Sequence, residues 1–256
     1  ELPAVRTPIC LADSCTLRGA VARRMWAACA PCRTNFVTPM ASVAGSVAQE
    51  ILQCYVHQGI DRAWVNNGGD IALHLADGQE AVVGVVADVA ALRRAPVQTA
   101  AWLLDGQIRI ASTMPVRGVA TSGWRGRSQS LGIADSVTVL AATAAHADAA
   151  ATMVANAVNI EDVRIHRLPA QQVRDDSDLG TLPVTVDVPA LPPEAVHLAL
   201  QNGLYKAHRL QQQGLLWFAL LTCQGQHAAT AQAPGGHLPQ GTRISMREPV
   251  AGSAFA

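Results

Sequence analysis

The sequence has little charge, and the charge that it has is balanced. Only 15% of its 256 residues are charged, with 19 basic and 19 acidic side chains, so the formal net charge is zero. Proteins that bind nucleic acid usually present a basic stripe to the phosphates, and this chain has none, which argues against nucleic acid as a partner. Half of the residues are apolar, so a chain of this length can bury a substantial core as one large domain or a duplicated pair.

Long hydrophobic runs are also absent. No apolar stretch reaches the ~18 to 20 residues that a helix needs to cross a bilayer. The first ten residues, ELPAVRTPIC, contain neither the basic nor the apolar region of a signal peptide. We therefore expect a soluble, cytoplasmic protein with no membrane partner.

Familiar catalytic spacings of histidine are missing. The eight histidines form neither HExxH nor HxxEH, and no Ser/His/Asp order stands out, so the catalytic residues are unknown. His146 is near the candidate site below, but its position is typical of a solvated helix residue. A structural zinc could use the C-x4-C and C-x2-C spacings of Cys10, Cys15, Cys29 and Cys32. Knuckle-like Gly and aromatic residues do not accompany them, which favours reduced thiols over a zinc-bearing interaction module.

Apolar periodicity predicts an α+β fold. Period-2 alternation in many short segments favours a largely antiparallel sheet. The helical period recurs in four longer segments, at 21–30, 42–58, 143–158 and 193–213. Residues 1–20 are expected to be irregular because prolines and a glycine interrupt every period.

The helix at 42–58 has two contrasting faces. Its larger apolar residues recur at helical spacing, and its small ones allow close backbone approach: Val43, Val47, Ile51 and Tyr55 in the first set, Ala44, Gly45, Ser46 and Ala48 in the second. One interpretation is tight helix packing. The other is a helix N-terminus whose free N–H groups face an anionic ligand, with residues 38–41 as the lip of the site.

The loop WRGRSQSLG at 124–132 joins two predicted strands. Arg125 and Arg127 flank a glycine, and Ser128 and Ser130 follow, so guanidinium groups, hydroxyls and backbone N–H groups can surround a phosphate or carboxylate. A solvated hairpin connection is the alternative. We predict that at least one of the two arginines faces the main cleft.

Oxygen ligands recur in two further segments. Asp148 and Thr152 stand at i and i+4 of a predicted helix, which puts a carboxylate and a hydroxyl on one face, as a hard divalent cation requires. The alternative is a helix-terminus aspartate beside a buried threonine. Asp176 and Asp178 lie in a turn before a strand, where they cap the turn or act as a second candidate metal pair. The sequence NNGGD at 66–70 predicts a hairpin bend that also admits a ligand close to the backbone.

Several of these motifs, in order, resemble those of one family. The segments NNGGDI (66–71), TSGWRGRS (121–128), SVTV (136–139), ADAAAT (147–152) and DSDLG (176–180) are similar to the UPF0280 branch of the ApbE superfamily. The resemblance extends from about Val21 to Gly225. It implies a single domain over 1–225 with a duplicated T-fold arrangement of antiparallel sheets and long helices, followed by a peripheral tail over 226–256. Relatives of this branch usually carry sequence before an ELP-like segment, so an incomplete N-terminus is an open interpretation.

The resemblance also implies ligands. ApbE proteins are FAD:protein FMN transferases in which the Asp and Thr of an ADALAT-like motif help to bind Mg²⁺, which implies Mg²⁺ at Asp148 and Thr152. A flavin, FAD or FMN, or a related pterin- or nucleotide-like heterocycle is the implied organic ligand. The expected ligand-binding residues are Thr38, Pro39, Met40, Asn66, Asn67, Gly68, Gly69, Asp70, Thr121, Ser122, Gly123, Arg125, Arg127, Ser128 and Ser130.

Two departures keep the reaction open. Where ApbE enzymes have a KGxAxD-like segment, this chain has AGSVAQ (44–49), and no His occupies the interval between TSG and SVTV. One hypothesis is therefore a Mg²⁺-dependent transferase or hydrolase. A second is a non-catalytic protein that kept the binding site, and the zinc-bearing module is a third. The oligomeric state, including a homodimer, is left open.

Overall fold

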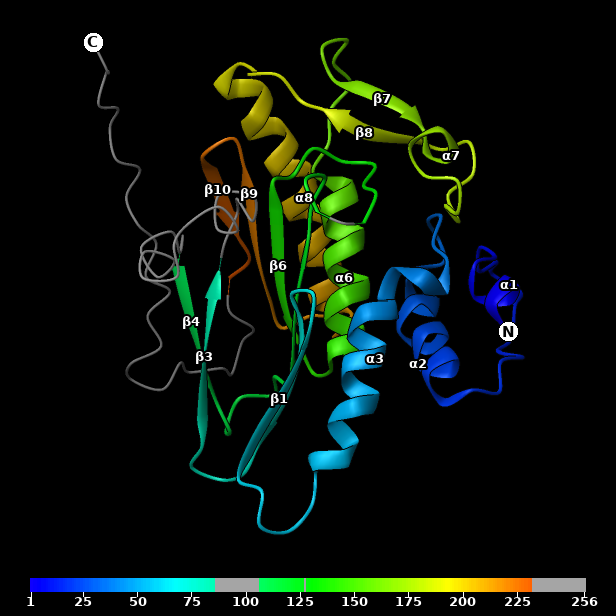
Figure 1. Cartoon of the computed structure of the whole chain (residues 1–256). Coiled ribbons are helices and arrows are strands. Elements are labelled where there is room, and N and C mark those ends of the chain that lie inside the picture. The colour runs from blue at the N-terminus through cyan, green and yellow to red at the C-terminus, as the bar shows by residue number, and fades with distance from the viewer. Residues whose placement is uncertain (86–105, 127, 232–256) are drawn as a thin grey trace.

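The computed structural model describes residues 1–85, 106–126 and 128–231, and these form three layers (Figure 1). A six-stranded sheet lies in the middle. Helices α3, α6 and α8, whose bounds are given below, cover one of its faces, and the β3–β4 hairpin covers the other.

Every pair of neighbouring strands in the sheets is antiparallel. The central sheet has the order β1 (Arg62–Asn67), β2 (Asp70–Leu75), β5 (Gly118–Ser122), β6 (Ser136–Ala141), β9 (Phe218–Cys223) and β10 (Gln226–Ala229). Two-stranded sheets are formed by β3 (Glu80–Val85) with β4 (Gly106–Ala111), and by β7 (His166–Pro169) with β8 (Pro183–Asp187). The predicted α+β class with antiparallel sheets is confirmed, while the duplicated T-fold stays a prediction.

The four predicted helices are present, with one of them broken into shorter pieces. They are α2 (Ala20–Cys29), α3 (Val43–Leu52) flanked by the 3-10 turns η2 (Pro39–Ser42) and η3 (Gln53–Tyr55), α6 (Ala144–Ala157) and α8 (Pro193–Gln212). Shorter pieces are α1 (Leu2–Val5), η1 (Ala30–Cys32) and α7 (Ala170–Val173). The prediction that residues 1–20 are irregular throughout was wrong for α1, where Pro3 sits in the first turn and suits a helix start. No helix within the described residues combines the length and apolarity needed to cross a membrane.

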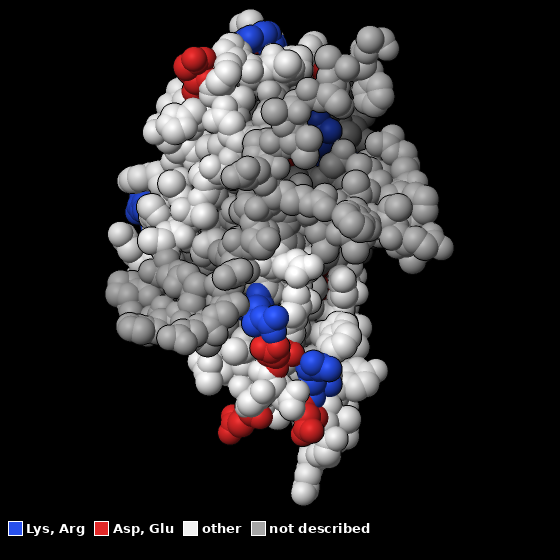
Figure 2. Space-filling view, turned by 90° about the vertical axis from the view of Figure 1, so that its left-hand side faces the viewer, with Lys and Arg blue, Asp and Glu red and all other residues white. Residues whose placement is uncertain are grey.

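Strand β6 is buried along its whole length and separates two apolar clusters. Because side chains alternate between the faces of a strand, Val137 and Val139 point to the helices, whereas Leu140 points to the β3–β4 side. There it packs with Phe218 and Leu220 of β9. On the outer side of the β3–β4 hairpin, Arg109 forms an ion pair with Glu80. Charged side chains of both signs lie side by side on this side of the molecule (Figure 2).

The buried face of α3 carries its small residues. The buried residues of α3 are Gly45, Ser46, Ala48 and Leu52, whereas Ile51 is 46% exposed and Tyr55, in η3, is 48% exposed. The reason is the closeness of α6: a Cβ added at Gly45 would lie 2.3 Å from the carbonyl oxygen of Ala144. Only the small-residue face fits against α6, which confirms the tight-packing interpretation.

The NNGGD segment forms the predicted hairpin between β1 and β2. Gly68 and Gly69 have φ angles of +73° and +118°, which residues with a side chain rarely adopt. The N–H of Gly69 donates to Oδ1 of Asn66 at 2.9 Å, and Asn67 is opposite Asp70. This turn places Asp70 at the start of β2.

The chain beyond Gly225 continues the sheet as β10, which runs antiparallel to β9. The structured part therefore extends past the predicted domain end at 225. Residues 86–105 and 232–256 and Arg127 lie outside the described residues.

Candidate functional site

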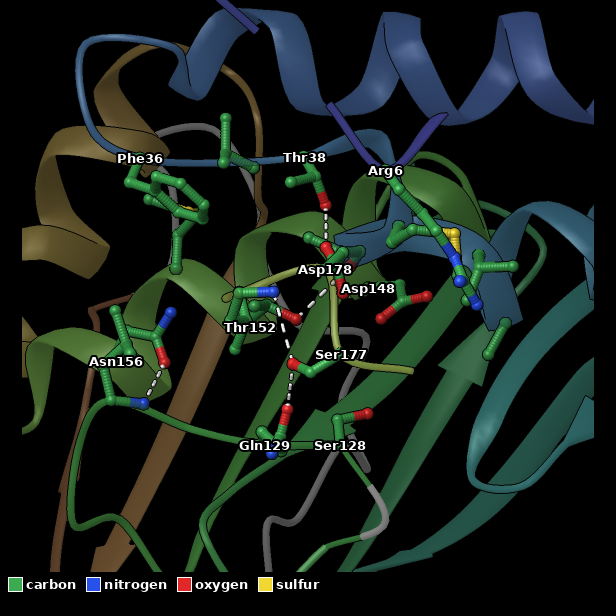
Figure 3. A pocket seen from close by; sticks show the side chains of 18 of the residues that line it. Arg6, Phe36, Thr38, Ser128, Gln129, Asp148, Thr152, Asn156, Ser177 and Asp178 are labelled. Atoms are coloured by element: carbon green, nitrogen blue, oxygen red, sulfur yellow. Dashed lines mark hydrogen bonds between the residues drawn. The ribbon is translucent and has the colours of Figure 1, made fainter. Parts of the chain in front are cut away.

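A cavity of about 220 Å³ lies where η2, α6 and two loops meet, one at 128–131 and one at 174–179 (Figure 3). Its lining is about half polar and half apolar. The polar side chains are Arg6, Thr38, Asp70, Ser128, Gln129, Asp148, Thr152, Asn156, Arg174, Asp176, Ser177 and Asp178. The cavity thus combines four carboxylates with two guanidinium groups.

Asp148 connects the cavity to the start of α3. Its Oδ2 accepts a hydrogen bond from the N–H of Gly45 at 2.9 Å, and the N–H of Ala44 also interacts with the carboxylate. Because the first N–H groups of a helix have no partner within the helix, Asp148 acts as the N-terminal cap of α3 from another helix. The expectation that these N–H groups are free to face an anionic ligand was therefore wrong.

The carboxyl group of Asp148 is unusually hard to ionise. Burial raises its pKa well above the ordinary value of 3.8, the carboxylate of Asp70 raises it further, and the hydrogen bonds from Gly45 and Ala44 act in the opposite direction. Asp70 itself accepts a hydrogen bond from the N–H of Thr121 at 3.3 Å. Two carboxylates from distant segments therefore face one cavity and disfavour each other's charge.

Thr152 lies one helical turn after Asp148 and lines the same cavity, as the i, i+4 spacing predicts. Its hydroxyl donates to the carbonyl oxygen of Ala41 at 3.3 Å. That bond uses the hydroxyl hydrogen and leaves the oxygen lone pairs available to a ligand or cation.

The loop at 174–179 is fastened to both sides of the cavity. Thr38 Oγ1 donates to Asp178 Oδ2, and Ser177 Oγ donates to Gln129 Oε1. Gln129 in turn donates through Nε2 to the carbonyl oxygen of Ala170 at 2.9 Å. Asp178 therefore holds the cavity wall as well as facing the interior, while Asp176 is 68% exposed at the rim.

Most of the other predicted ligand residues do not line the cavity. Those outside its lining are Pro39, Asn66, Asn67, Gly68, Gly69, Thr121, Ser122, Gly123, Arg125 and Ser130. Thr38, Met40, Asp70 and Ser128 are the predicted ligand residues that do line it, as do both predicted metal pairs.

Several residues outside the lining have structural contacts that explain their positions. Asn67 Nδ2 donates to the carbonyl oxygen of Ala44 at 3.2 Å and so ties the hairpin to α3. The hydroxyls of Thr121 and Thr138 lie 3.0 Å apart across β5 and β6. Ser130 Oγ donates to Asn156 Oδ1 at 3.1 Å, which positions a residue of the cavity wall.

The RGRS loop does not direct Arg125 to the cavity. Arg125 Nε lies 3.3 Å from Asp135 Oδ1, and the guanidinium stacks 4.9 Å from the ring centroid of Trp124. Asp135 also accepts from the backbone N–H of Gln224 at 2.6 Å. Arg125 does not line the cavity, and Arg127 is outside the described residues, so the expectation that at least one of the two arginines faces the main cleft stays a prediction.

Sequence reasoning missed five polar residues of the lining: Arg6, Gln129, Asn156, Arg174 and Ser177. Asn156 had a usable signal, because it continues the i, i+4 series of Asp148 and Thr152 along an alanine-rich helix. Ser177 lies inside the DSDLG motif. Arg6 had no signal, because it reaches the site from the segment that was expected to be irregular.

Neither the cysteines nor His146 adds to the site. Cys29 and Cys32 are buried, Cys10 and Cys15 are exposed, and the described residues contain no group of three or more His, Cys, Asp or Glu arranged to hold a metal ion. The zinc-bearing module has no support in this part of the chain. His146 is half-buried rather than solvated, with Nδ1 2.8 Å from Thr143 Oγ1, and burial lowers its pKa.

Comparison with known proteins places the chain in a family. A family model described as "AbpE bacteria" matches residues 1–229. A UPF0280 protein of Methanothermobacter thermautotrophicus is 41% identical over 127 residues, which are 49% of this chain and 44% of the relative. A UPF0280 protein of Methanothrix thermoacetophila is 38% identical over 123 residues, which are 48% of this chain and 46% of the relative. A UPF0280 protein of Archaeoglobus fulgidus is 33% identical over 140 residues, 55% of this chain and 51% of its own.

These alignments leave part of each relative unmatched. The chain spans about half the length of the curated relatives that it matches. The family model, by contrast, covers nearly all of the described residues. The chain therefore belongs to the family described as AbpE bacteria and is a relative of the UPF0280 proteins.

Proposed function

We propose that the cavity binds a small organic molecule of flavin-, pterin- or nucleotide-like type together with a divalent cation such as Mg²⁺. One observation carries the proposal. Seven predicted site residues from separate stretches of sequence line one cavity: Thr38, Asp70, Ser128, Asp148, Thr152, Asp176 and Asp178. The cavity, at about 220 Å³, is smaller than the roughly 300 to 1,000 Å³ of typical ligand sites, so part of such a molecule would extend to solvent.

The donor set suits a hard cation. Asp148, Thr152 and Asp70 offer only oxygen atoms. Burial and, after it, the charge of Asp70 raise the pKa of Asp148, and a divalent cation near them would favour the ionised carboxylate. Three side chains are too few for a closed cage, so water and oxygen atoms of the organic molecule would complete the site. When bound, the cation would neutralise and orient negative oxygen atoms of that molecule.

The reaction, if the protein is an enzyme, is proposed to be a transfer or hydrolysis, as the resemblance to ApbE proteins implies. The duplicated T-fold is part of the same proposal. A non-catalytic binding protein is the second candidate, and a specific observation favours it. Ala44 lines the cavity at the position of the lysine in the KGxAxD-like segment, and so it brings no amine to the site.

Titration of FMN, FAD and ADP into the protein, with Mg²⁺ and with a chelator, tests the proposal. We expect at least one of them to bind roughly tenfold or more weakly when Mg²⁺ is removed, because charge-assisted contacts of this kind are lost. Asp148→Asn should bind in Mg²⁺ as weakly as the parent does in chelator. Asp77→Asn, at an exposed turn away from the cavity, is the matched control and should behave as the parent.

Two outcomes would contradict the proposal. If the parent binds these compounds equally well with Mg²⁺ and with chelator, the proposal that a cation binds at the site is wrong. If none of the three compounds binds and native mass spectrometry of the purified protein finds no organic molecule, the proposed flavin-, pterin- or nucleotide-like ligand is wrong.

A further inference from the structure

Arg6 brings a guanidinium group to the cavity from the N-terminal segment, just after α1. It lies within the residues that the family model matches but in none of the motifs named in the sequence analysis. Figure 3 shows its side chain extending into the cavity that also holds Asp148. We propose that Arg6 recognises an oxyanion, a phosphate or a carboxylate, on the molecule bound there. This inference rests on the proposed function, because it names the charged group of the same ligand.

The hydrogen bonds of Arg6 are incomplete. Its Nε is buried and has no hydrogen-bond partner, and its Nη2 lies 3.7 Å from Asp176 Oδ2, beyond the roughly 2.7 to 3.2 Å of an N–H···O bond. Buried polar atoms in folded proteins are almost always hydrogen-bonded. An acceptor is therefore missing beside Nε.

A simple ion pair with Asp176 does not account for this arrangement. Asp176 is 68% exposed, and ion pairs of exposed side chains contribute little to stability. Such a pair would also leave the buried Nε–H unsatisfied. An oxyanion in the cavity would accept from Nε and an Nη of the same guanidinium edge, which is the two-point geometry in which arginine binds phosphates and carboxylates.

The helix N-terminus beside the cavity is already occupied. The N-terminus of α3 attracts negative charge, but the N–H groups of Gly45 and Ala44 interact with Asp148. Arg174 also lines the cavity and adds a second guanidinium from the loop that carries Asp176. The ligand's anionic group is thereby directed toward the arginine side of the cavity.

Calorimetric titration with inorganic pyrophosphate, and separately with oxalate, in Mg²⁺ tests this assignment. We expect Arg6→Gln to weaken the binding of the preferred anion by roughly tenfold or more, and Arg6→Lys to recover part of the loss through its charge. Arg23→Gln, at an exposed position of α2 away from the cavity, is the matched control and should leave affinity unchanged. Affinity for Mg²⁺ alone should be the same in all four proteins.

The two anions distinguish the sources of the oxyanion. Arg6-dependent binding of pyrophosphate assigns a phosphate group to the ligand, and Arg6-dependent binding of oxalate assigns a carboxylate. Equal affinities of the parent and Arg6→Gln for both anions, or no binding of either anion to the parent, would overturn the assignment. If the anion test fails but FMN, FAD or ADP still binds in an Asp148-dependent manner, only the role of Arg6 is wrong and the proposed function stands. If none of the three compounds binds either, both proposals are wrong. Unchanged melting temperatures of the arginine variants show that the comparison is between folded proteins.

Discussion

At the scale of single residues, Asp148 has a pKa that links the stability of the protein to pH. Its folded-state pKa lies above the ordinary 3.8 of the unfolded chain, so the folded protein keeps a proton that the unfolded chain has released. The free energy of unfolding therefore falls as pH rises from about 4 through the folded-state pKa.

The variant Asp148→Asn isolates this effect, since an amide does not ionise in this range. In chelator, urea unfolding of the parent should show a larger loss of stability between about pH 5 and about pH 8 than unfolding of the variant. Parallel pH profiles for the two proteins would show that Asp148 ionises normally. Asp77→Asn, at its exposed turn, should keep the profile of the parent.

At the scale of elements, the crossing of α3 over α6 depends on the missing side chain of Gly45. In an open helix Gly→Ala would stabilise by about 1 kcal/mol, but here the added Cβ would lie 2.3 Å from Ala144 O and 2.9 Å from Asp148 Cβ. We expect Gly45→Ala to destabilise the protein by roughly 1 to 3 kcal/mol.

The neighbouring Ser46→Ala provides the contrast. Its hydroxyl is buried with no hydrogen-bond partner, so its removal should be neutral or slightly stabilising. Denaturant unfolding of both variants measures the difference, and a Gly45→Ala protein as stable as the parent would show that the two helices separate easily.

The same element shows where prediction from sequence succeeds and fails. The β1–β2 hairpin was predictable because Gly68 and Gly69 dictate the bend locally. The helical period of α3 and the close packing of its small residues were also predictable, but the element that packs against them was not. The backbone of α6, about a hundred residues later in the chain, selects Gly45 and Ala48 over Ile51.

At the scale of the whole molecule, the central sheet supports an apolar layer on each face, so a defect on either face should weaken the entire fold. Leu140 of β6 is 1% exposed and lies in the layer beneath the β3–β4 hairpin. We expect Leu140→Ala to lower the free energy of unfolding by roughly 2 to 5 kcal/mol in a single transition.

Far-UV and near-UV circular dichroism during urea unfolding measure this cooperativity. Leu198→Ala, a 52% exposed position of α8, is the control and should change stability by less than about 0.5 kcal/mol. Separate transitions for the two signals would show that the hairpin layer unfolds independently of the helices.

The assembly of the site could be predicted only in part. The i, i+4 spacing of Asp148 and Thr152 predicted their common face, and motif order indicated that Asp70 belongs with them. Thr121 and Ser122 of the TSG segment instead end β5 and pair with β6, and Arg125 is held by Asp135. These outcomes depend on strand register and on a partner residue, neither of which is encoded in the local pattern. The place of Arg6 in the cavity likewise depends on tertiary packing and could not be predicted from its local sequence.

The cap that Asp148 provides for α3 has a consequence for how such proteins change over evolutionary time. A descendant that abandoned the cation, the ligand and any reaction would still need a hydrogen-bond acceptor at this position to hold the first turn of α3 against α6. Purifying selection for folding alone would retain it. Persistence of this aspartate among relatives is therefore a record of architecture, and a surviving activity would have to be traced through residues such as Thr152 and Arg6, whose contacts support the fold far less.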